Sequence, residues 1–215
     1  MCEVGKNKIF LPKGCPKKTD KIYFKHPQYT DMTFKEWFNN NHKNADPLTI
    51  SNIDCSYNML TSLQGLEDLV NLEVLDCSNN GITSLQGIEG LVKLEALYCD
   101  NNQITSLQEL EGAVNLKRVD CFYNQITSLE GIENLVNLEV LDITSSKLNS
   151  LKGIEPLLNL KELYVSFSKL RHLNGFAPIL SLPKLKKICF DGNSYSVADL
   201  KKQLKYISNI SIFSN

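Results

Sequence analysis

The sequence predicts an α/β repeat solenoid, a stack of short parallel strands closed at both ends by helical caps. Three observations predict it: leucines recur at a fixed interval, an asparagine follows each leucine group at a constant spacing, and helix-like segments flank the repeats. A short strand cannot bury its apolar side alone, so each repeat must pack against its neighbours.

The interval between equivalent leucines is 22 residues, except that the last interval is 25. Position 1 of the repeat is occupied by Ile50, Leu72, Leu94, Leu116, Leu138, Leu160 and Leu185. Position 4 is occupied by Ile53, Leu75, Leu97, Val119, Leu141, Leu163 and Ile188. Because adjacent parallel strands lie ~4.8 Å apart, residues at one repeat position should form continuous columns.

The unit L-x-x-L-x-C-x-x-N-x-I-T-S-L-x-G-I-E-x-L resembles the leucine-rich repeat, in the short 22-residue class of the type-1 phosphatase regulatory subunit and the internalins. The resemblance covers residues 50 to about 195. It implies a right-handed arc with parallel strands on the concave face and 3₁₀ or extended turns on the convex face. We divide the chain into a basic segment with a helical cap (1–49), the solenoid (50–184), and the last repeat with its cap (185–215).

Both ends have the pattern of caps that cover the terminal apolar surfaces. Thr33 and Glu36 have capping-box spacing, and Phe34, Trp37 and Phe38 share one helical face. At the other end, Ser196 can begin a helix with an apolar stripe made of Val197, Leu200, Leu204 and Ile207. The closing ISNISIF predicts a last edge strand.

Position 9 predicts a structural ladder of amides that bond loop backbone groups above and below. The ladder consists of Asn58, Asn80, Asn102, Asn124 and Asn193. Ser146 and Ser168 stand at the same position, and we expect their loops to differ because a hydroxyl is shorter. Glu109 replaces the glycine of the other repeats, which indicates that this position does not strictly require positive φ.

Position 6 predicts a buried column of small apolar residues, which free cysteine can fill. Its members are Cys55, Cys77, Cys99, Cys121, Ile143, Val165 and Phe190. In-register side chains point the same way, which fits neither disulfide torsion nor tetrahedral zinc, so we favour reduced thiols over disulfides or a metal site. The state of Cys2 and Cys15 stays open.

Composition and charge favour a soluble protein that binds neither nucleic acid nor membrane. Hydrophobic residues make up 42% and charged residues 22%, and no apolar run approaches the ~20 residues of a membrane helix. The start, MCEVGKNKIFLPKG, lacks the apolar core of a secretory signal, so we expect a cytoplasmic location. Residues 50–182 carry seventeen acids against eight bases, whereas both flanks are basic. An acidic concave face would repel a duplex, and we interpret the flanking lysines as solvated.

No motif predicts catalysis or a cofactor. The sequence has no glycine-rich phosphate loop, no CxxC and no HExxH. His26, His42 and His172 lie outside the expected concave strands, and none is placed beside a nucleophile and an orienting acid. We therefore expect no enzyme activity, no catalytic residue, no metal and no cofactor.

The concave positions 3, 5, 7 and 8 are free to specify a partner. Position 5 is rich in acids, which either are solvated residues of the generic repeat or form a row that a basic partner neutralises. Aromatic residues at these positions are not needed by the core, and with Arg118 they are the residue types of binding hot spots, although they can also pack across strands. The expected binding residues are Asp54, Tyr57, Asp76, Tyr98, Asp100, Arg118, Asp120, Phe122, Tyr123, Asp142, Tyr164 and Phe167.

These observations predict a non-enzymatic scaffold, expected to be a monomer, whose concave face binds a protein segment that is basic and partly apolar. One alternative is a substrate-recognition or regulatory subunit of a larger complex of the phosphatase or ubiquitin-ligase type. Another is a structural, self-assembling repeat protein. The sequence itself names no partner.

Overall fold

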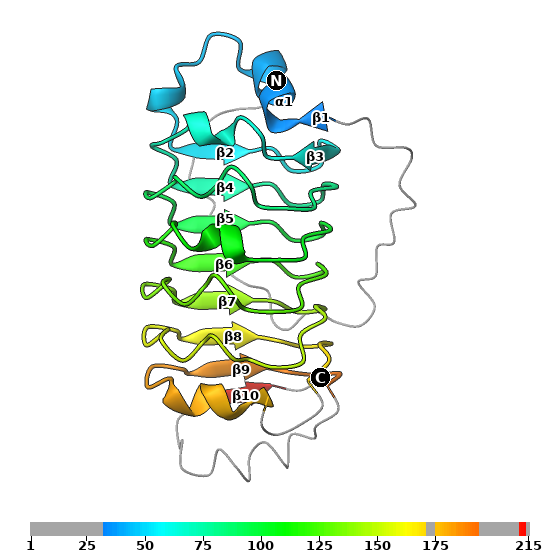
Figure 1. The fold of residues 1–215 in the computed structure, drawn as a ribbon, viewed down its shortest axis with the longest axis vertical. Helices are drawn as coiled ribbons and strands as arrows, with labels where there is room; N and C mark the ends of the chain where they lie inside the picture. The colour runs from blue at the N-terminus through cyan, green and yellow to red at the C-terminus, as the bar shows by residue number, and fades with distance from the viewer. Residues whose placement is uncertain (1–31, 171–174, 194–210, 214–215) are drawn as a thin grey trace.

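The computed structural model describes residues 32–170, 175–193 and 211–213. Within them, a parallel sheet of eight strands runs the length of the molecule in the order β10-β9-β8-β7-β6-β5-β4-β2, one strand per turn (Figure 1). The strands are β2 Asn52–Asp54, β4 Val74–Asp76, β5 Ala96–Tyr98, β6 Arg118–Asp120, β7 Val140–Asp142, β8 Glu162–Tyr164, β9 Lys187–Cys189 and β10 Ser211–Phe213. The solenoid expected from the repeats is confirmed.

The N-terminal cap is built as expected. Strand β1 (Met32–Thr33) pairs with β3 (Leu60–Ser62), and helix α1 (Phe34–Asn41) follows directly. The Glu36 N–H donates to the Thr33 hydroxyl at 3.2 Å, and the Thr33 N–H donates to Glu36 Oε2 at 2.8 Å, which completes the capping box. Phe34 and Trp37 are buried in the solenoid core, so the helix covers the first turn.

The C-terminal end is confirmed in part. Strand β10 pairs in parallel with β9 through Ser211 opposite Lys187, which makes it the expected edge strand. The helix expected to begin at Ser196 lies outside the described residues. The longer last interval is taken up by a five-residue 3₁₀ helix, Ala177–Ser181.

The core lies between the sheet and the turns, and it is filled by the columns predicted from the repeat. The side chains at positions 1, 4, 6 and 11 are buried in the middle turns, as Leu94, Leu97, Cys99 and Ile104 illustrate. Strand burial alternates, because the middle residue of each three-residue strand points into the core while its first residue points outward.

The turn opposite the strands explains why the repeat contains T-S-L-x-G-I-E. In one representative turn, the Ser84 hydroxyl accepts from the Gln86 N–H at 3.1 Å and the Glu89 carboxylate accepts from the Gly87 N–H at 2.6 Å. The same two bonds recur around Gly65 and Gly153. These serine and glutamate side chains accept from loop N–H groups that would otherwise be bonded within a helix. Part of the excess of acids in the repeats therefore has a local structural cause.

Glu109 shows what happens when the turn glycine is absent. Gly87 and Gly131 adopt φ of 108° and 100°, and a Cβ on Gly131 would lie 2.3 Å from Gln108 Cα. At Glu109 the chain instead forms a 3₁₀ helix, Gln108–Leu110. The position therefore accepts another residue only because the backbone takes a different path.

Asparagines at position 9 form a ladder of buried amides, which bonds toward the preceding turn. Asn102 donates to the carbonyls of Cys99 in its own turn (3.1 Å) and Cys77 in the preceding turn (3.0 Å), and accepts from the Ile82 N–H (3.0 Å). Asn80 and Asn124 bond the same way. These three amides thus join their own turn to the preceding one, rather than to turns on both sides, whereas Asn58 donates to the Ser56 carbonyl within its own turn.

The two serine turns differ less than expected. The hydroxyls of Ser146 and Ser168 bond each other at 3.0 Å in place of the amide bonds. The backbone follows the same path as in the asparagine turns, since Lys147 N–H still donates to the Ile126 carbonyl at 2.8 Å. The expected difference is therefore confined to side-chain bonding.

Candidate interaction face

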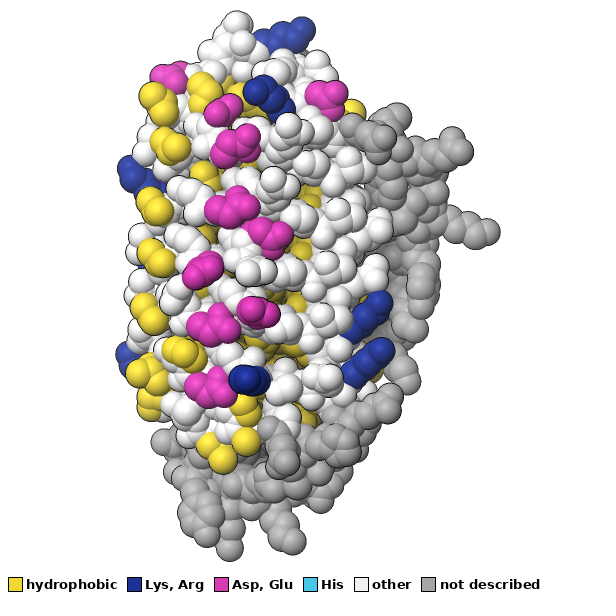
Figure 2. All heavy atoms as spheres, viewed as in Figure 1, with side chains coloured by type: hydrophobic (Ala, Val, Ile, Leu, Met, Phe, Trp, Pro, Cys, Tyr) yellow, Lys and Arg dark blue, Asp and Glu magenta, His cyan; other side chains and the backbone are white. Residues whose placement is uncertain are grey.

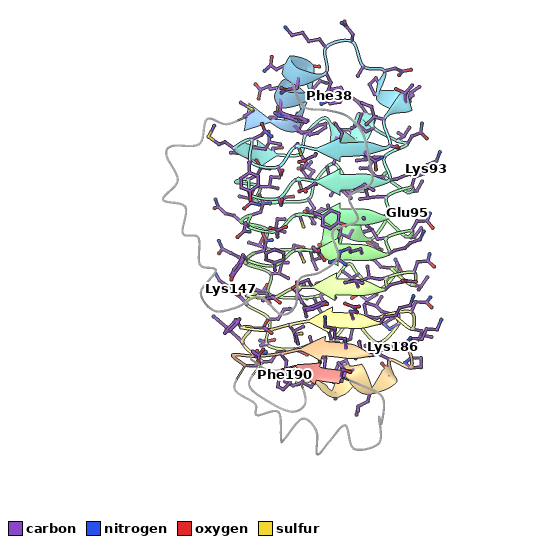
Figure 3. The ribbon with its side chains drawn as sticks, turned by 180° about the vertical axis from the view of Figure 1, so that it is seen from behind. Phe38, Lys93, Glu95, Lys147, Lys186 and Phe190 are labelled. Atoms are coloured by element: carbon purple, nitrogen blue, oxygen red, sulfur yellow. The ribbon has the colours of Figure 1, made fainter. Side chains whose placement is uncertain are left out.

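The surface expected to be concave is formed by the outward side chains of β2 to β9 and the loops that follow each strand, and we call it the strand face. Figure 3, turned by 180° from Figure 1, shows the molecule from this side. The position-5 residues are paired in register from one strand to the next. The row is Asp54, Asp76, Tyr98, Asp120, Asp142, Tyr164 and Cys189.

Three of the four aspartates in this row have a local structural role. Asp54 accepts from the Ser56 N–H at 3.0 Å, Asp76 from the Ser78 N–H at 3.0 Å, and Asp142 from the Thr144 N–H at 2.9 Å. Asp readily accepts from the backbone two residues on. The acids in these turns therefore support the loop after the strand, and any binding role comes in addition.

Asp120 is different because its partner is a cation. Arg118 Nε and Nη2 both donate to Asp120 Oδ2, at 3.0 and 2.7 Å, and the guanidinium carbon lies 5.8 Å from the centre of the Tyr98 ring. Asp120 is only 7% exposed, and its Oδ1 has no hydrogen-bond partner. Burial raises the pKa of Asp120 even though the Arg118 guanidinium opposes the shift.

Two further carboxylates are strongly perturbed. Burial, together with the nearby charges of Asp76 and Asp120, raises the pKa of Asp100 to about 7. Burial and the neighbouring Asp120 charge raise the pKa of Asp142 to about 7, against the effect of its bond from Thr144. The centre of the strand face thus holds more carboxylates than its own cations neutralise.

Tyr164 was expected to be exposed on the binding surface, but the structure buries it. Its side chain is 2% exposed, and its hydroxyl donates to Glu162 Oε2 at 2.5 Å and accepts from Lys187 Nζ at 2.8 Å. Lys187 Nζ also lies 4.7 Å from the ring centre. Tyr164 is therefore held within the face by Glu162 and Lys187, and in this conformation it cannot serve as an exposed anchor for a partner.

The residue at position 8 has a left-handed backbone in every turn. Tyr57, Tyr123 and Phe167 adopt φ of 58°, 53° and 54°, where Asn79 and Asn101 adopt 56° and 52°. Asparagine adopts this conformation more easily than bulky residues. These aromatics are among the binding residues expected from the sequence, but their backbone strain depends on the loop path and is not visible in the sequence.

The position-8 aromatics differ in packing. Tyr57 is 68% exposed. Tyr123 packs edge to face on Phe122, with ring centres 5.6 Å apart. A Cβ on Gly192 would lie 2.2 Å from the Phe167 ring, so the missing side chain of that glycine makes room for Phe167.

The cysteine column is buried, and its four thiols are free. Burial raises the pKa of Cys55 and Cys77, which makes these thiols poor nucleophiles and poor metal ligands. The four cysteines therefore fill the core as expected, and their reduced state stays a prediction.

The opposite, turn-side surface carries a feature that sequence analysis missed. One exposed aliphatic residue per turn recurs at the repeat spacing, each 40 to 59% exposed, beside a column of acids (Figure 2). This aliphatic column consists of Leu48, Val70, Val92, Val114, Val136, Leu158 and Leu180. Its signal, an apolar residue at position 21 of each repeat, is visible in the sequence.

A second amide ladder runs beside the aliphatic column. Asn115 donates to the Val92 carbonyl at 2.8 Å, and Asn137 to the Val114 carbonyl at 3.1 Å, each reaching into the preceding turn. Lys93 replaces one asparagine and donates to Asn71 Oδ1 at 2.7 Å. These bonds are exposed to solvent, so they stabilise the stack less than the buried ladder does.

The described part of the chain carries neither a metal-binding cluster nor a membrane-spanning helix. It contains no group of three or more His, Cys, Asp or Glu placed to hold a metal ion. None of its helices has the length and apolarity required to cross a bilayer.

A family model for leucine-rich repeats, in its two-copy form, matches residues 50–88, 70–112 and 114–157. The stacked parallel strands, the buried leucine columns and the asparagine ladder agree with it. The chain is a leucine-rich repeat protein.

Solved internalins share the fold. An internalin (InlF) from Listeria monocytogenes aligns with a TM-score of 0.72 at 21% identity, over 78% of this chain and 49% of that one. Internalin C2 of the same organism aligns with a TM-score of 0.58 at 25% identity, over 76% of this chain and 81% of that one. The chain thus spans about half the length of the InlF chain.

A third solved structure also shares the fold. The functional domain of InlJ from Listeria monocytogenes, described as including a cysteine ladder, aligns with a TM-score of 0.58 at 22% identity, over 78% of this chain and 40% of that one. At this identity the likeness concerns the fold alone. No curated protein sequence matches the chain.

Proposed function

We propose that this protein is a non-enzymatic interaction scaffold whose strand face binds a basic, partly apolar segment of another protein. Leucine-rich repeat proteins and internalin-like folds are in general protein-binding modules, and the chain belongs to that class. The identity of the partner and the use of this particular face are the parts we infer.

Charge supports this choice of partner. At repeat positions 3, 5, 7 and 8 the strand face carries two bases, Arg118 and Lys187, and more than twice as many acids. Arg118 already pairs with Asp120, and Lys187 already bonds Tyr164. The acids of the face are Asp54, Asp76, Asp100, Asp120, Asp142, Glu162 and Asp191. Like charges in adjacent strands repel, and a basic segment would relieve that repulsion.

The observation that carries the proposal is the placement of aromatics at strained positions. Tyr57 and Tyr123 occupy left-handed backbone where asparagine, present in two intervening turns, costs less. Strained residues of this kind concentrate at functional sites. Aromatic side chains that the core does not need are the usual anchors of an interface.

The test is capture of partners from cell lysate by the full chain, with identification by mass spectrometry. We expect the double variant Tyr98→Ala/Tyr123→Ala to lose partners that the unmodified protein captures. About 0.5 M salt should release the same partners, because it screens exposed charges beyond a few Å.

The matched control is Val92→Thr/Val136→Thr on the turn side, which should capture the same partners. Both double variants must unfold at denaturant concentrations close to that of the unmodified protein. Equal capture by the tyrosine variant and the unmodified protein would contradict the proposal. The same capture experiment tests the regulatory-subunit alternative, which requires that a captured partner be an enzyme. The cytoplasmic location stays a prediction.

The aliphatic column supports a second candidate, self-association. A second copy of this chain carries the same spacing of ~4.8 Å per residue along its column, so two columns can interlock over their whole length. A row of exposed aliphatic residues is unusual on a monomer and is typical of contact surfaces.

Sedimentation equilibrium separates this candidate from the monomer expected from the sequence. If it holds, the unmodified protein forms dimers at high concentration and Val92→Thr/Val136→Thr stays monomeric. A monomer at every concentration would exclude it without affecting the strand-face proposal.

A further inference from the structure

Four consecutive strands place a short acidic and aromatic row at the centre of the strand face. Tyr98 of β5 is paired in register with Asp120 of β6, Asp120 with Asp142 of β7, and Asp142 with Tyr164 of β8. Because neighbouring strands lie ~4.8 Å apart, the two carboxylates are close enough to share one cation.

The two tyrosines are each already in contact with a cation of this chain. Arg118 lies over the Tyr98 ring at 5.8 Å, and Lys187 lies over the Tyr164 ring at 4.7 Å. Both cations also bond an oxygen on the face, Arg118 at Asp120 Oδ2 and Lys187 at the Tyr164 hydroxyl. The outer parts of the row are therefore satisfied internally.

The middle of the row is not satisfied. Asp120 is only 7% exposed, and its buried Oδ1 has no hydrogen-bond partner. Asp142 accepts from the Thr144 N–H, a neutral donor, at 2.9 Å. An unpaired buried carboxylate oxygen costs free energy that a positively charged donor can recover.

We propose that Asp120 and Asp142 form a slot for one lysine or arginine side chain of the bound partner. The inference rests on the proposed function and identifies the chemistry of its central contact. An ammonium or guanidinium group has several N–H donors, enough to bond Asp120 Oδ1 and a free oxygen of Asp142 together. The tyrosines on either side limit the slot to a single side chain.

The slot should be sensitive to pH. Asp142 lies beside Asp120 and Arg118 on β6, Tyr164 on β8, and Thr144 in its own loop. The carboxylate of Glu162 on β8 accepts from the Tyr164 hydroxyl. Its pKa of about 7 means that it is partly protonated at neutral pH, and a cation binds the ionised form. Affinity for a cationic side chain should therefore increase as the pH is raised through 7.

The test uses the full chain and a defined probe, N-acetyl-arginine methylamide, with the citrulline analogue as a neutral probe of the same shape. Binding is measured from the NMR shifts of backbone amides in β6 and β7. Asp142→Asn keeps the acceptor for the Thr144 N–H but removes the charge, so the fold should be retained. Asp46→Asn is the control, because Asp46 accepts the same kind of local bond, from the Leu48 N–H at 3.0 Å, but lies outside the strand face.

We expect shifts with the arginine probe and none with the citrulline probe. Asp142→Asn should weaken binding at least about tenfold, the loss expected for one charged hydrogen bond, and Asp46→Asn should leave it unchanged. Affinity should be higher at about pH 8 than at about pH 6.

Three results would overturn the slot: no shifts at about 50 mM arginine probe, equal shifts with citrulline, or equal binding by Asp142→Asn. Saturation of the same amides by calcium chloride alone would identify a metal site instead. Partner capture that still depends on Tyr98 and Tyr123 would leave the proposed function standing in each case.

Discussion

Arg118 directs two N–H groups at one oxygen of Asp120, at 3.0 and 2.7 Å, and leaves the other oxygen of that carboxylate buried without a partner. The ion pair is therefore only half satisfied in the free protein. The intact pair carries a free-energy cost because Asp120 Oδ1 is buried without a donor. Removing Arg118 would cost more, because the whole Asp120 charge would then be buried without a partner.

Arg118→Met should lower the free energy of unfolding by about 3 kcal/mol, since it leaves the Asp120 charge buried and unpaired. Urea denaturation measures the change. The double variant Arg118→Met/Asp120→Asn should recover most of the loss because no buried charge remains. Lys117→Met, which breaks the half-exposed pair with Glu95, should change stability by at most about 0.5 kcal/mol. Equal losses for Arg118 and Lys117 would contradict this account.

Asn102→Ala should destabilise the protein by about 3 kcal/mol, because it leaves the buried Ile82 N–H without its acceptor and removes two further buried bonds. The Cys77 and Cys99 carbonyls each keep one other amide donor, from Asn80 and Asn124. Asn115→Ala removes one exposed bond to Val92 and should cost about 1 kcal/mol or less. The comparison is made by urea denaturation at constant m-value. Similar costs at both sites would show that burial does not separate the two ladders.

Tyr57→Asn should raise stability by about 1 kcal/mol, because asparagine tolerates the left-handed backbone that Tyr57 adopts. The reciprocal change, Asn79→Tyr, should lower stability by a similar amount. Thermal melting of both variants measures the effect. If Tyr57→Asn also weakens partner capture, the tyrosine is retained for binding at the expense of stability; a destabilised Tyr57→Asn would contradict the strain argument.

Stability should decrease as the pH rises from about 4, where aspartate titrates in an unfolded chain, to about 7, the raised pKa of Asp100 and Asp142. Over this range the folded protein holds protons that the unfolded chain has released, so deprotonation favours unfolding. Asp100→Asn and Asp142→Asn should each reduce this slope in urea denaturation series at several pH values.

Glu36 provides a contrast of opposite sign. Its hydrogen bonds from Thr33 lower the pKa of Glu36, so its contribution to stability is present above the unfolded pKa and is lost as the pH falls. Glu36→Gln should therefore remove stability at neutral pH and leave stability below pH ~3 unchanged. A pH profile unaltered by all three substitutions would exclude this assignment.

The four thiols of the cysteine column should resist alkylation while the protein is folded. Cys55, Cys77, Cys99 and Cys121 are fully buried, and burial raises the pKa of Cys55 and Cys77, which lowers the thiolate fraction. Iodoacetamide labelling mapped by mass spectrometry should reach these sites only across the urea transition. Rapid labelling of Cys99 in the absence of urea would show that the stack opens locally.

Much of the fold could be predicted because it depends on periodicity. Position 4 residues such as Leu75 and Leu97 lie in register because every turn has the same length, and the Asn102 ladder follows from the need to satisfy buried loop groups. The capping box at Thr33 depends on residues three apart in the chain, so it too was visible locally. The aliphatic column containing Val92 and Val114 could have been found by the same periodicity.

The sequence by itself determined the stack of parallel strands, its columns and its N-terminal cap, because each depends on spacing along the chain. Only the tertiary structure decided that Tyr164 is enclosed by Glu162 and Lys187, that Asp120 keeps an unpaired oxygen, and that Tyr57 adopts a left-handed backbone. These properties arise between side chains of neighbouring turns and from the path of each loop, where distances and burial are set by packing rather than by the order of residues.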